Sequence, residues 1–309
     1  MHSELHRYMT VGLVHPMAFP RAIGEKGEIY NTLLTVAKDA FFGSVEITGI
    51  PDGEERGRVK QLLDSSGLVV CYAAQPLILG RQANLNALNE EDREFALKLL
   101  RQAVDEAYEL GAIRLAVVSG PDPGEALRAR AVDKAVESLI ELCAYARAGG
   151  NLQIVLETFD FDVDKRRLLG PNALCLEVAR RVREIDPSFG LMVDLSHFPL
   201  QHESTRDAVR LTREAITHAH MGNCYMKDES DIAYGDLHPR FAYPGGENGA
   251  PELAEYLREL FEIGYIYEGG ANIVAFEVKP LPGEEPEVVL AQSKRTLLEA
   301  WRLANISAS

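Results

Sequence analysis

The chain has 309 residues, a formal net charge of -15 and an isoelectric point near 5.0. A chain of this length can bury a large core within one domain. Its acidic charge argues against sequence-independent binding to nucleic acid or to an anionic membrane, because both depend on an excess of lysine and arginine.

The spacing of the cysteines and the composition of the N-terminal segment indicate the cellular compartment of the protein. The four cysteines are spaced singly, without a CxxC pair, and predict reduced thiols in the core: Cys71, Cys143, Cys175 and Cys224. Residues 1–10 lack the apolar stretch of a secretory signal, and the apolar runs elsewhere are too short to cross a bilayer. We therefore expect a cytoplasmic protein with no membrane partner.

Short apolar runs alternate along the chain with longer segments of helical character. The runs predict eight strands, at residues 11–15, 44–50, 68–74, 113–119, 152–156, 189–193, 216–219 and 273–276. The predicted helices span residues 28–40, 56–65, 89–110, 125–147, 174–185, 204–213, 251–263 and 287–304. The helix at 89–110 has the clearest ends, since Asn89 suits an N-cap and Gly111 suits a helix stop.

No linker or change of composition interrupts this alternation. The apolar runs lack polar residues at every second position, which is typical of parallel strands buried on both faces. The pattern predicts an α/β fold, a (β/α)8 TIM barrel that forms a single domain over residues 1–309. An open, doubly wound sheet is the alternative, and periodicity does not separate the two.

Four of the later strands end on a residue type that binds metals. These residues are Glu157, Asp194, His220 and Glu277. A polar group at the end of a buried strand is costly unless something satisfies it. Strand ends converge only if they form a ring, so the set favours the barrel. Three carboxylates and one imidazole suit one divalent ion, such as Mn²⁺, Mg²⁺, Co²⁺ or Zn²⁺.

The segments around these residues resemble the xylose-isomerase-like barrel superfamily, which contains sugar isomerases, sugar epimerases and endonuclease IV. They read LE at 156–157, VDLSH at 193–197, HAHMGN at 218–223 and FEVK at 276–279, and the resemblance covers essentially the whole chain. In the ketose 3-epimerase branch the four matching residues hold one divalent metal, and the two glutamates exchange protons with the sugar. The resemblance implies that Glu157 and Glu277 act as acid and base on a sugar or sugar acid, through a metal-stabilised enediolate.

A second group of residues is expected to bind substrate. His197 matches a histidine that contacts substrate in the epimerase branch. Asp236 and His238 resemble the Asp-x-His motif of endonuclease IV, where such a pair, with a histidine that matches His197, holds a further zinc. These three residues could therefore hold a second metal ion, and we favour binding of sugar hydroxyls. Lys279 lies two residues after Glu277 on the same side of the strand, and with nearby cations such as Lys165 could bind a carboxylate or phosphate.

The sequence lacks some site residues of endonuclease IV and some of the ketose 3-epimerases. Endonuclease IV has two more histidines at earlier strand ends, where this chain reads YAAQ at 72–75 and VSG at 118–120. The additional glutamate and arginine that usually grip substrate in the epimerases are replaced or shifted, with FDFDVDKR at 159–166 and YMKD at 225–228. A metal-dependent lyase of an oxidised sugar is therefore the main alternative, ahead of a non-catalytic metabolite-binding barrel and a nuclease. A homo-oligomer is also possible.

Overall fold

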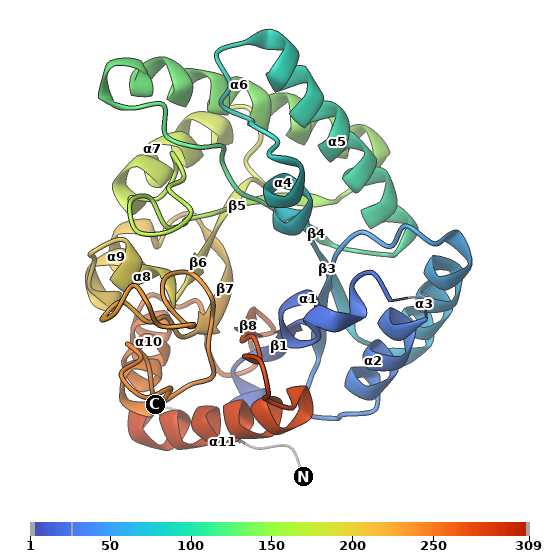
Figure 1. Cartoon of the computed structure of the whole chain (residues 1–309), viewed down its shortest axis with the longest axis vertical. Helices are drawn as coiled ribbons and strands as arrows, with labels where there is room; N and C mark the ends of the chain where they lie inside the picture. Colours follow the sequence, from blue (N-terminus) through green and yellow to red (C-terminus); the bar gives the residue numbers. More distant parts are fainter. Residues whose placement is uncertain (1–3, 26, 307–309) are drawn as a thin grey trace.

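The computed structural model describes residues 4–25 and 27–306 and is a closed barrel of eight parallel strands in chain order (Figure 1). The strands are β1 Thr10–Val14, β2 Ser44–Ile47, β3 Val69–Ala73, β4 Arg114–Val117, β5 Gln153–Glu157, β6 Gly190–Asp194, β7 Ile216–Gly222 and β8 Ile273–Glu277. β1 pairs with both β2 and β8, which closes the ring. The predicted single-domain TIM barrel is confirmed, and the open-sheet alternative is wrong. The boundaries 1–309 stay a prediction.

Helices surround the ring of strands (Figure 1). Eight of them correspond to the predicted helices: α2 Glu28–Ala37, α3 Gly53–Ser66, α5 Glu90–Glu109, α6 Glu125–Gly149, α7 Asn172–Arg183, α9 Thr205–Thr212, α10 Ala250–Glu262 and α11 Pro286–Ala304. The ends of α5 are as predicted: the Asn89 side chain accepts a hydrogen bond from the Glu91 amide at 2.9 Å, and Gly111 has a φ of 76°. No helix among the described residues is long and apolar enough to span a membrane.

Short helices occupy several connections that the sequence suggested were irregular. They are η1 Glu4–Arg7, α1 His15–Ala18, η2 Pro20–Ala22, α4 Gln75–Arg81 and α8 His197–Leu200. Three of them, α1, α4 and α8, begin close behind the ends of β1, β3 and β6 and therefore lie at the mouth where those strands end. Segments of four to seven residues are too short to show a helical period, so sequence patterns did not reveal them.

Apolar side chains lie beneath three of the polar strand ends at this mouth. Val155, Met192 and Ala275 are fully or almost fully buried, and each lies two residues before a strand-end carboxylate. Since side chains alternate across a strand, these three point into the barrel beneath the carboxylates. The four cysteines are also buried and form no disulfide. The carboxylates at the ends of β5, β6 and β8 therefore lie above packed apolar side chains.

Candidate active site

Four predicted metal ligands meet at the mouth of the barrel. Glu157, Asp194 and Glu277 are the last residues of β5, β6 and β8, and His220 lies within β7. The strand register places Asp194 opposite His220, and Glu277 opposite Gly222. One possible ligand atom from each of the four residues lies within 4.8 Å of the others. The four side chains can therefore reach one small ion.

The ring of His220 has a defined orientation in this cluster. Its Nε2 donates a hydrogen bond to Glu46 Oε1 at 2.9 Å, from β2 on the other side of the barrel. Its Nδ1 lies 2.6 Å from Glu277 Oε2 and 3.8 Å from Glu157 Oε1. A neutral histidine that carries its proton on Nε2 has a free lone pair on Nδ1. The atom that faces the carboxylates is therefore the one that can bind a metal.

Glu157 gives an independent test of whether an ion fits here. Its Oε2 accepts a hydrogen bond from Gln75 Nε2 at 2.8 Å, whereas Oε1 is buried and has no hydrogen-bond partner. A buried, unsatisfied carboxylate oxygen is energetically costly. The unsatisfied oxygen belongs to the same donor set as Asp194, His220 and Glu277. The donors present fit a hard or borderline divalent ion.

The pKa values of Glu157 and Glu277 are shifted in opposite directions. Burial, reinforced by the nearby charge of Glu277, raises the pKa of Glu157 to about 8. Burial would also raise the pKa of Glu277, but the neighbouring His238 and His220 outweigh it and lower that pKa to about 2. Burial also raises the pKa of Asp194. The three carboxylates therefore repel one another when all are ionised, which a bound cation would relieve.

A second buried cluster lies next to the first. Asp236 Oδ1 accepts a hydrogen bond from His197 Nε2 at 3.0 Å and lies 2.7 Å from His238 Nε2 in an ion pair. His197 Nδ1 is also bonded, to the carbonyl oxygen of Thr158 at 3.0 Å. Burial would lower the pKa of His197, but the carboxylate of Asp236 outweighs it and raises that pKa well above its ordinary value. The structure thus brings together the three residues predicted to bind substrate or a second ion.

The contact between Asp236 and His238 does not arise from an extended segment. His238 has a φ of 51°, in the left-handed region, so the chain turns there. This turn leaves His238 Nδ1 3.7 Å from Asp194 Oδ2. Asp194, His197 and His238 form a second set of possible metal donors within 4.8 Å of one another. The second cluster therefore touches the first through Asp194.

A pocket of about 250 Å³ opens onto both clusters, and we call it the inner pocket. Its polar lining includes Gln75, Glu157, Asp236, His238, Glu277 and Lys279. His197 is completely buried, with both ring nitrogens bonded as described, and so supports Asp236 from below. Lys279 shares the pocket with Glu277, in agreement with the strand period.

The loop after β5 forms one rim of the inner pocket. The buried carboxylate of Asp160 accepts hydrogen bonds from the backbone amides of five residues that follow it, at positions 162–166. The loop therefore folds around one side chain. Lys165 lines the inner pocket from this loop and is ion-paired with Asp164.

Sequence patterns gave no role in the site to Gln75 or His218, and they suggested only that Glu46 completes the floor or wall of the pocket. Gln75 binds Glu157, Glu46 binds His220, and His218 Nε2 donates to the same oxygen of Glu46 at 2.6 Å. Glu46 could have been recognised because a carboxylate within a buried strand needs a partner. His218 could have been recognised because it lies two residues before His220 and so on the same side of the strand. Gln75 offered no signal of this kind, because it belongs to a connection whose helix was not predicted.

The chain matches a known protein family in sequence and several solved structures in fold. The sequence profile of the xylose isomerase-like TIM barrel family matches residues 34–299. Searching the curated proteins returned no match. Three solved structures with similar folds are a D-tagatose 3-epimerase-like protein, L-ribulose 3-epimerase and the IOLI protein with a bound zinc atom.

These three structures match along almost their full length. The D-tagatose 3-epimerase-like protein has a TM-score of 0.72 and 20% identity, over 96% of this chain and 98% of that one. L-ribulose 3-epimerase has a TM-score of 0.72 and 16% identity, over 97% and 98%. The IOLI protein has a TM-score of 0.71 and 12% identity, over 97% and 100%. At such identities the likeness demonstrates a shared fold.

Proposed function

We propose, from the premise that the chain belongs to the xylose isomerase-like TIM barrel family, that it is a divalent-metal-dependent isomerase or epimerase of a sugar or sugar acid. The observation that carries the proposal is the convergence of Glu157, Asp194, His220 and Glu277, of which Glu157 and Glu277 line the inner pocket. The names of two similar structures, both referring to sugar 3-epimerases, support the same reaction class.

The four converging residues would hold the metal ion. Such an ion acts as a Lewis acid, which stabilises negative charge that develops on oxygen atoms of a substrate. Glu46 and Gln75 hold two of the ligands in place, through hydrogen bonds to His220 and Glu157. Partners of this kind fix the orientation of metal ligands.

Glu157 and Glu277 are proposed to move the proton. They extend from β5 and β8, which are not neighbours in the ring, and both line the inner pocket. A sugar between them would present a carbon atom next to its carbonyl group to both carboxylates. One carboxylate would remove the proton from this carbon, which leaves an enediolate, and the other would return a proton. Return to the opposite face gives an epimer, and return to the neighbouring carbon gives an isomer.

Substrate hydroxyls are proposed to bind to Asp236 and His238, since both line the inner pocket. His197 would position Asp236 by hydrogen bonding from the buried side. The alternative role for His197, Asp236 and His238, a second metal site, draws on the donor set that His197 and His238 form with Asp194. The metal content of a His197 variant separates the two roles.

The test is the incorporation of solvent deuterium into a panel of ketoses and aldoses by the Mn²⁺-loaded protein. We expect exchange with at least one sugar, and a loss of about 100-fold or more in Glu277→Gln. Glu287→Gln, which changes an exposed glutamate on α11, is the matched control and should exchange normally. Full exchange by a metal-bound Glu277→Gln protein would remove the catalytic role of Glu277. Release of carbon dioxide or water without exchange would instead favour a lyase.

A further inference from the structure

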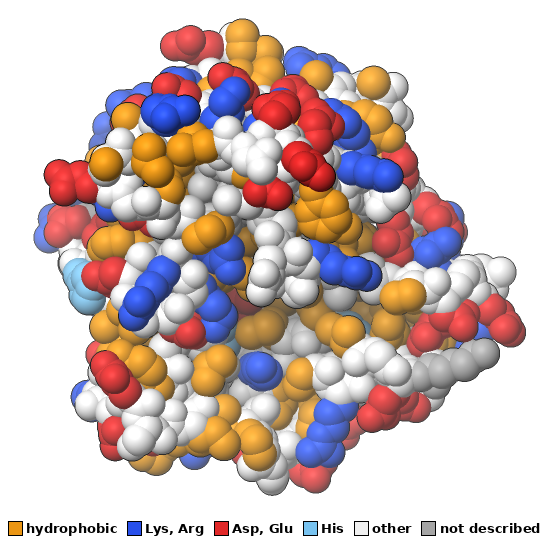
Figure 2. All heavy atoms as spheres, turned by 45° about the horizontal axis from the view of Figure 1, so that its top comes forward, with side chains coloured by type: hydrophobic (Ala, Val, Ile, Leu, Met, Phe, Trp, Pro, Cys, Tyr) orange, Lys and Arg blue, Asp and Glu red, His pale blue; other side chains and the backbone are white. Residues whose placement is uncertain are grey.

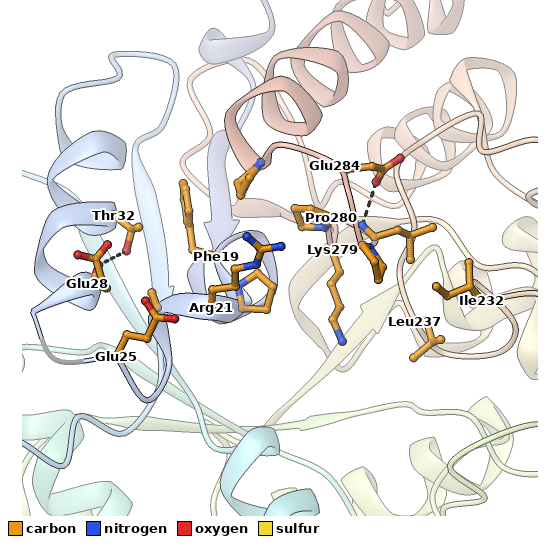
Figure 3. Close-up of a pocket in the computed structure, with 15 residues that line it drawn as sticks. Phe19, Arg21, Glu25, Glu28, Thr32, Ile232, Leu237, Lys279, Pro280 and Glu284 are labelled. Atoms are coloured by element: carbon orange, nitrogen blue, oxygen red, sulfur yellow. Dashed lines mark hydrogen bonds between the residues drawn. The ribbon is translucent and has the colours of Figure 1, made fainter.

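A second pocket of about 420 Å³ adjoins the inner pocket, and we call it the outer pocket (Figure 3). Lys279 and Leu237 line both pockets, so the two cavities meet at these side chains. The walls of the outer pocket come from η2, from α2 and from the segments that follow β7 and β8. A molecule bound at the metal donors can therefore extend past Lys279 into the outer pocket.

Two cations of the outer pocket have no partner among the residues that the structure describes. The side chains of Arg21 and Lys279 make no hydrogen bond or ion pair with any residue in the ranges 4–25 and 27–306. Figure 3 shows both reaching into the pocket, Arg21 from η2 and Lys279 from the segment after β8. Other cations near the two pockets are paired, Lys165 with Asp164 and Arg240 with Glu284. Unpaired cations facing a shared cavity are available to a ligand.

The carboxylates of the outer pocket do not neutralise these cations. Glu284 accepts hydrogen bonds from Arg240 Nε at 3.0 Å and from the Leu281 amide at 2.9 Å. Glu28 begins α2 and Glu25 lies in the turn before it, and Figure 3 shows both on the wall of the pocket opposite Lys279. Within the part of the chain that the structure describes, none of these three carboxylates forms an ion pair with Arg21 or Lys279.

The apolar part of the outer pocket's wall strengthens the attraction of Arg21 and Lys279 for an anion. Apolar side chains form most of the remaining wall, among them Phe19, Pro20, Pro280, Leu281 and Pro282. An apolar wall lowers the local dielectric, so a cation attracts an anion there more strongly than on an open surface. Figure 2 shows a hollow on the face that it presents, with lysine and arginine side chains near its rim.

We propose that the outer pocket binds an acidic group of the substrate, a carboxylate or a phosphate, through Lys279 and Arg21, and that the substrate is therefore an acidic sugar. Lysine and arginine are the side chains that recognise both kinds of anion. The inference rests on the proposed function, because it assumes that the sugar portion occupies the inner pocket. It adds the class of substrate and the residues that would select it.

The experiment compares three ketoses that differ only at carbon 6: D-fructose, D-fructose 6-phosphate and D-fructuronate. Their binding to the Mn²⁺-loaded protein is measured by calorimetry, and their deuterium exchange is followed in parallel. We expect one acidic ketose to bind about tenfold or more tightly than D-fructose. Whichever of the two acidic ketoses shows the larger advantage identifies the anion as a phosphate or a carboxylate.

Variants then assign this advantage to the two cations. Lys279→Met should reduce the ratio of acidic to neutral affinity by about tenfold, and Arg21→Met should reduce it by a smaller factor. Lys60→Met removes one charge from the surface of α3, where Lys60 pairs with Asp64, and should leave the ratio unchanged. Metal content is measured for every variant, so that a loss of the ion is not mistaken for a loss of the anion site.

Two outcomes would overturn the inference alone. Equal binding of the acidic and neutral ketoses, with deuterium exchange intact, would leave the sugar reaction standing and remove the anion site. An acidic advantage that survives in both Lys279→Met and Arg21→Met would place the anion elsewhere. If no ketose binds or exchanges while the metal is bound, the proposed function fails and this inference fails with it.

Discussion

Glu46 on β2 and His220 on β7 form a 2.9 Å hydrogen bond across the barrel, although they are 174 positions apart in the sequence. The same oxygen of Glu46 accepts a 2.6 Å hydrogen bond from His218. Burial would raise the pKa of Glu46, but the two histidines outweigh it and hold that pKa well below its ordinary range. Glu46 therefore stays ionised and fixes the ring of His220 with Nδ1 toward Glu157 and Glu277.

The first prediction concerns this orientation. Glu46→Gln keeps an oxygen that can accept a hydrogen bond but removes the charge, so we expect metal affinity to fall about 10- to 100-fold. Competition with a chromogenic chelator measures the change. Glu106→Gln is the control, since Glu106 is a hydrogen-bonded carboxylate that binds Tyr72 away from the metal donors. Unchanged affinity in Glu46→Gln would show that His220 needs no support from Glu46.

The second prediction concerns the number of ions. Elemental analysis of untagged protein should find one divalent ion per chain, because one donor set among the described residues includes the unsatisfied oxygen of Glu157. Glu157→Ala should lose this ion, and His197→Ala should keep it. A second ion in the parent protein that disappears in His197→Ala would contradict the prediction. It would assign His197, Asp236 and His238 to a second metal site.

The third prediction concerns stability in acid. His15 is buried at the end of β1, and its Nε2 lies 2.8 Å from Thr32 Oγ1, whose own hydroxyl donates to the Glu28 carbonyl oxygen. Burial lowers the pKa of His15 to about 3, below its unfolded value near 6.5. The unfolded chain therefore takes up this proton first, and stability is present above pH 6.5 and is lost as the pH falls toward 3.

The corresponding measurement is urea unfolding at pH 7 and pH 5. Between these values His15 should account for a loss of about 2 kcal/mol in the free energy of unfolding, and His15→Gln should lack this part of the loss. His202→Gln removes an exposed histidine and serves as the control. Parallel pH curves for the parent protein and His15→Gln would refute the prediction.

The fourth prediction concerns the loop after β5. Asp160→Asn replaces an oxygen and the charge that hold five backbone amides, so we expect a loss of about 2 kcal/mol in stability. Amide hydrogen exchange at residues 162–166 should accelerate more than elsewhere in the barrel. Asp162→Asn, at a half-exposed position in the same loop, should have little effect. Equal exchange in the Asp160 and Asp162 variants would mean that other contacts hold the loop.

Local patterns in the sequence were sufficient for the main elements. All eight strands lie where apolar runs predicted them, because strands buried on both faces need continuous apolar residues. The observed ends differ by a few residues for a physical reason. Glu157, for example, was expected just beyond its strand but still pairs with Met192 in the sheet. Backbone hydrogen bonding, which continues past the apolar side chains, sets the true end of a strand.

What the sequence determined by itself was the alternation of eight strands with eight helices, and the four residues Glu157, Asp194, His220 and Glu277 as possible metal donors, which together favoured the barrel. These features depend on neighbours within a strand and on the position of a strand end, both of which are local. Only the tertiary structure decided that Glu46 and Gln75 support the donors, that His197 is buried behind Asp236, and that Lys279 joins two pockets. Such contacts join residues from distant strands and loops, and they form only when the ring closes with one register.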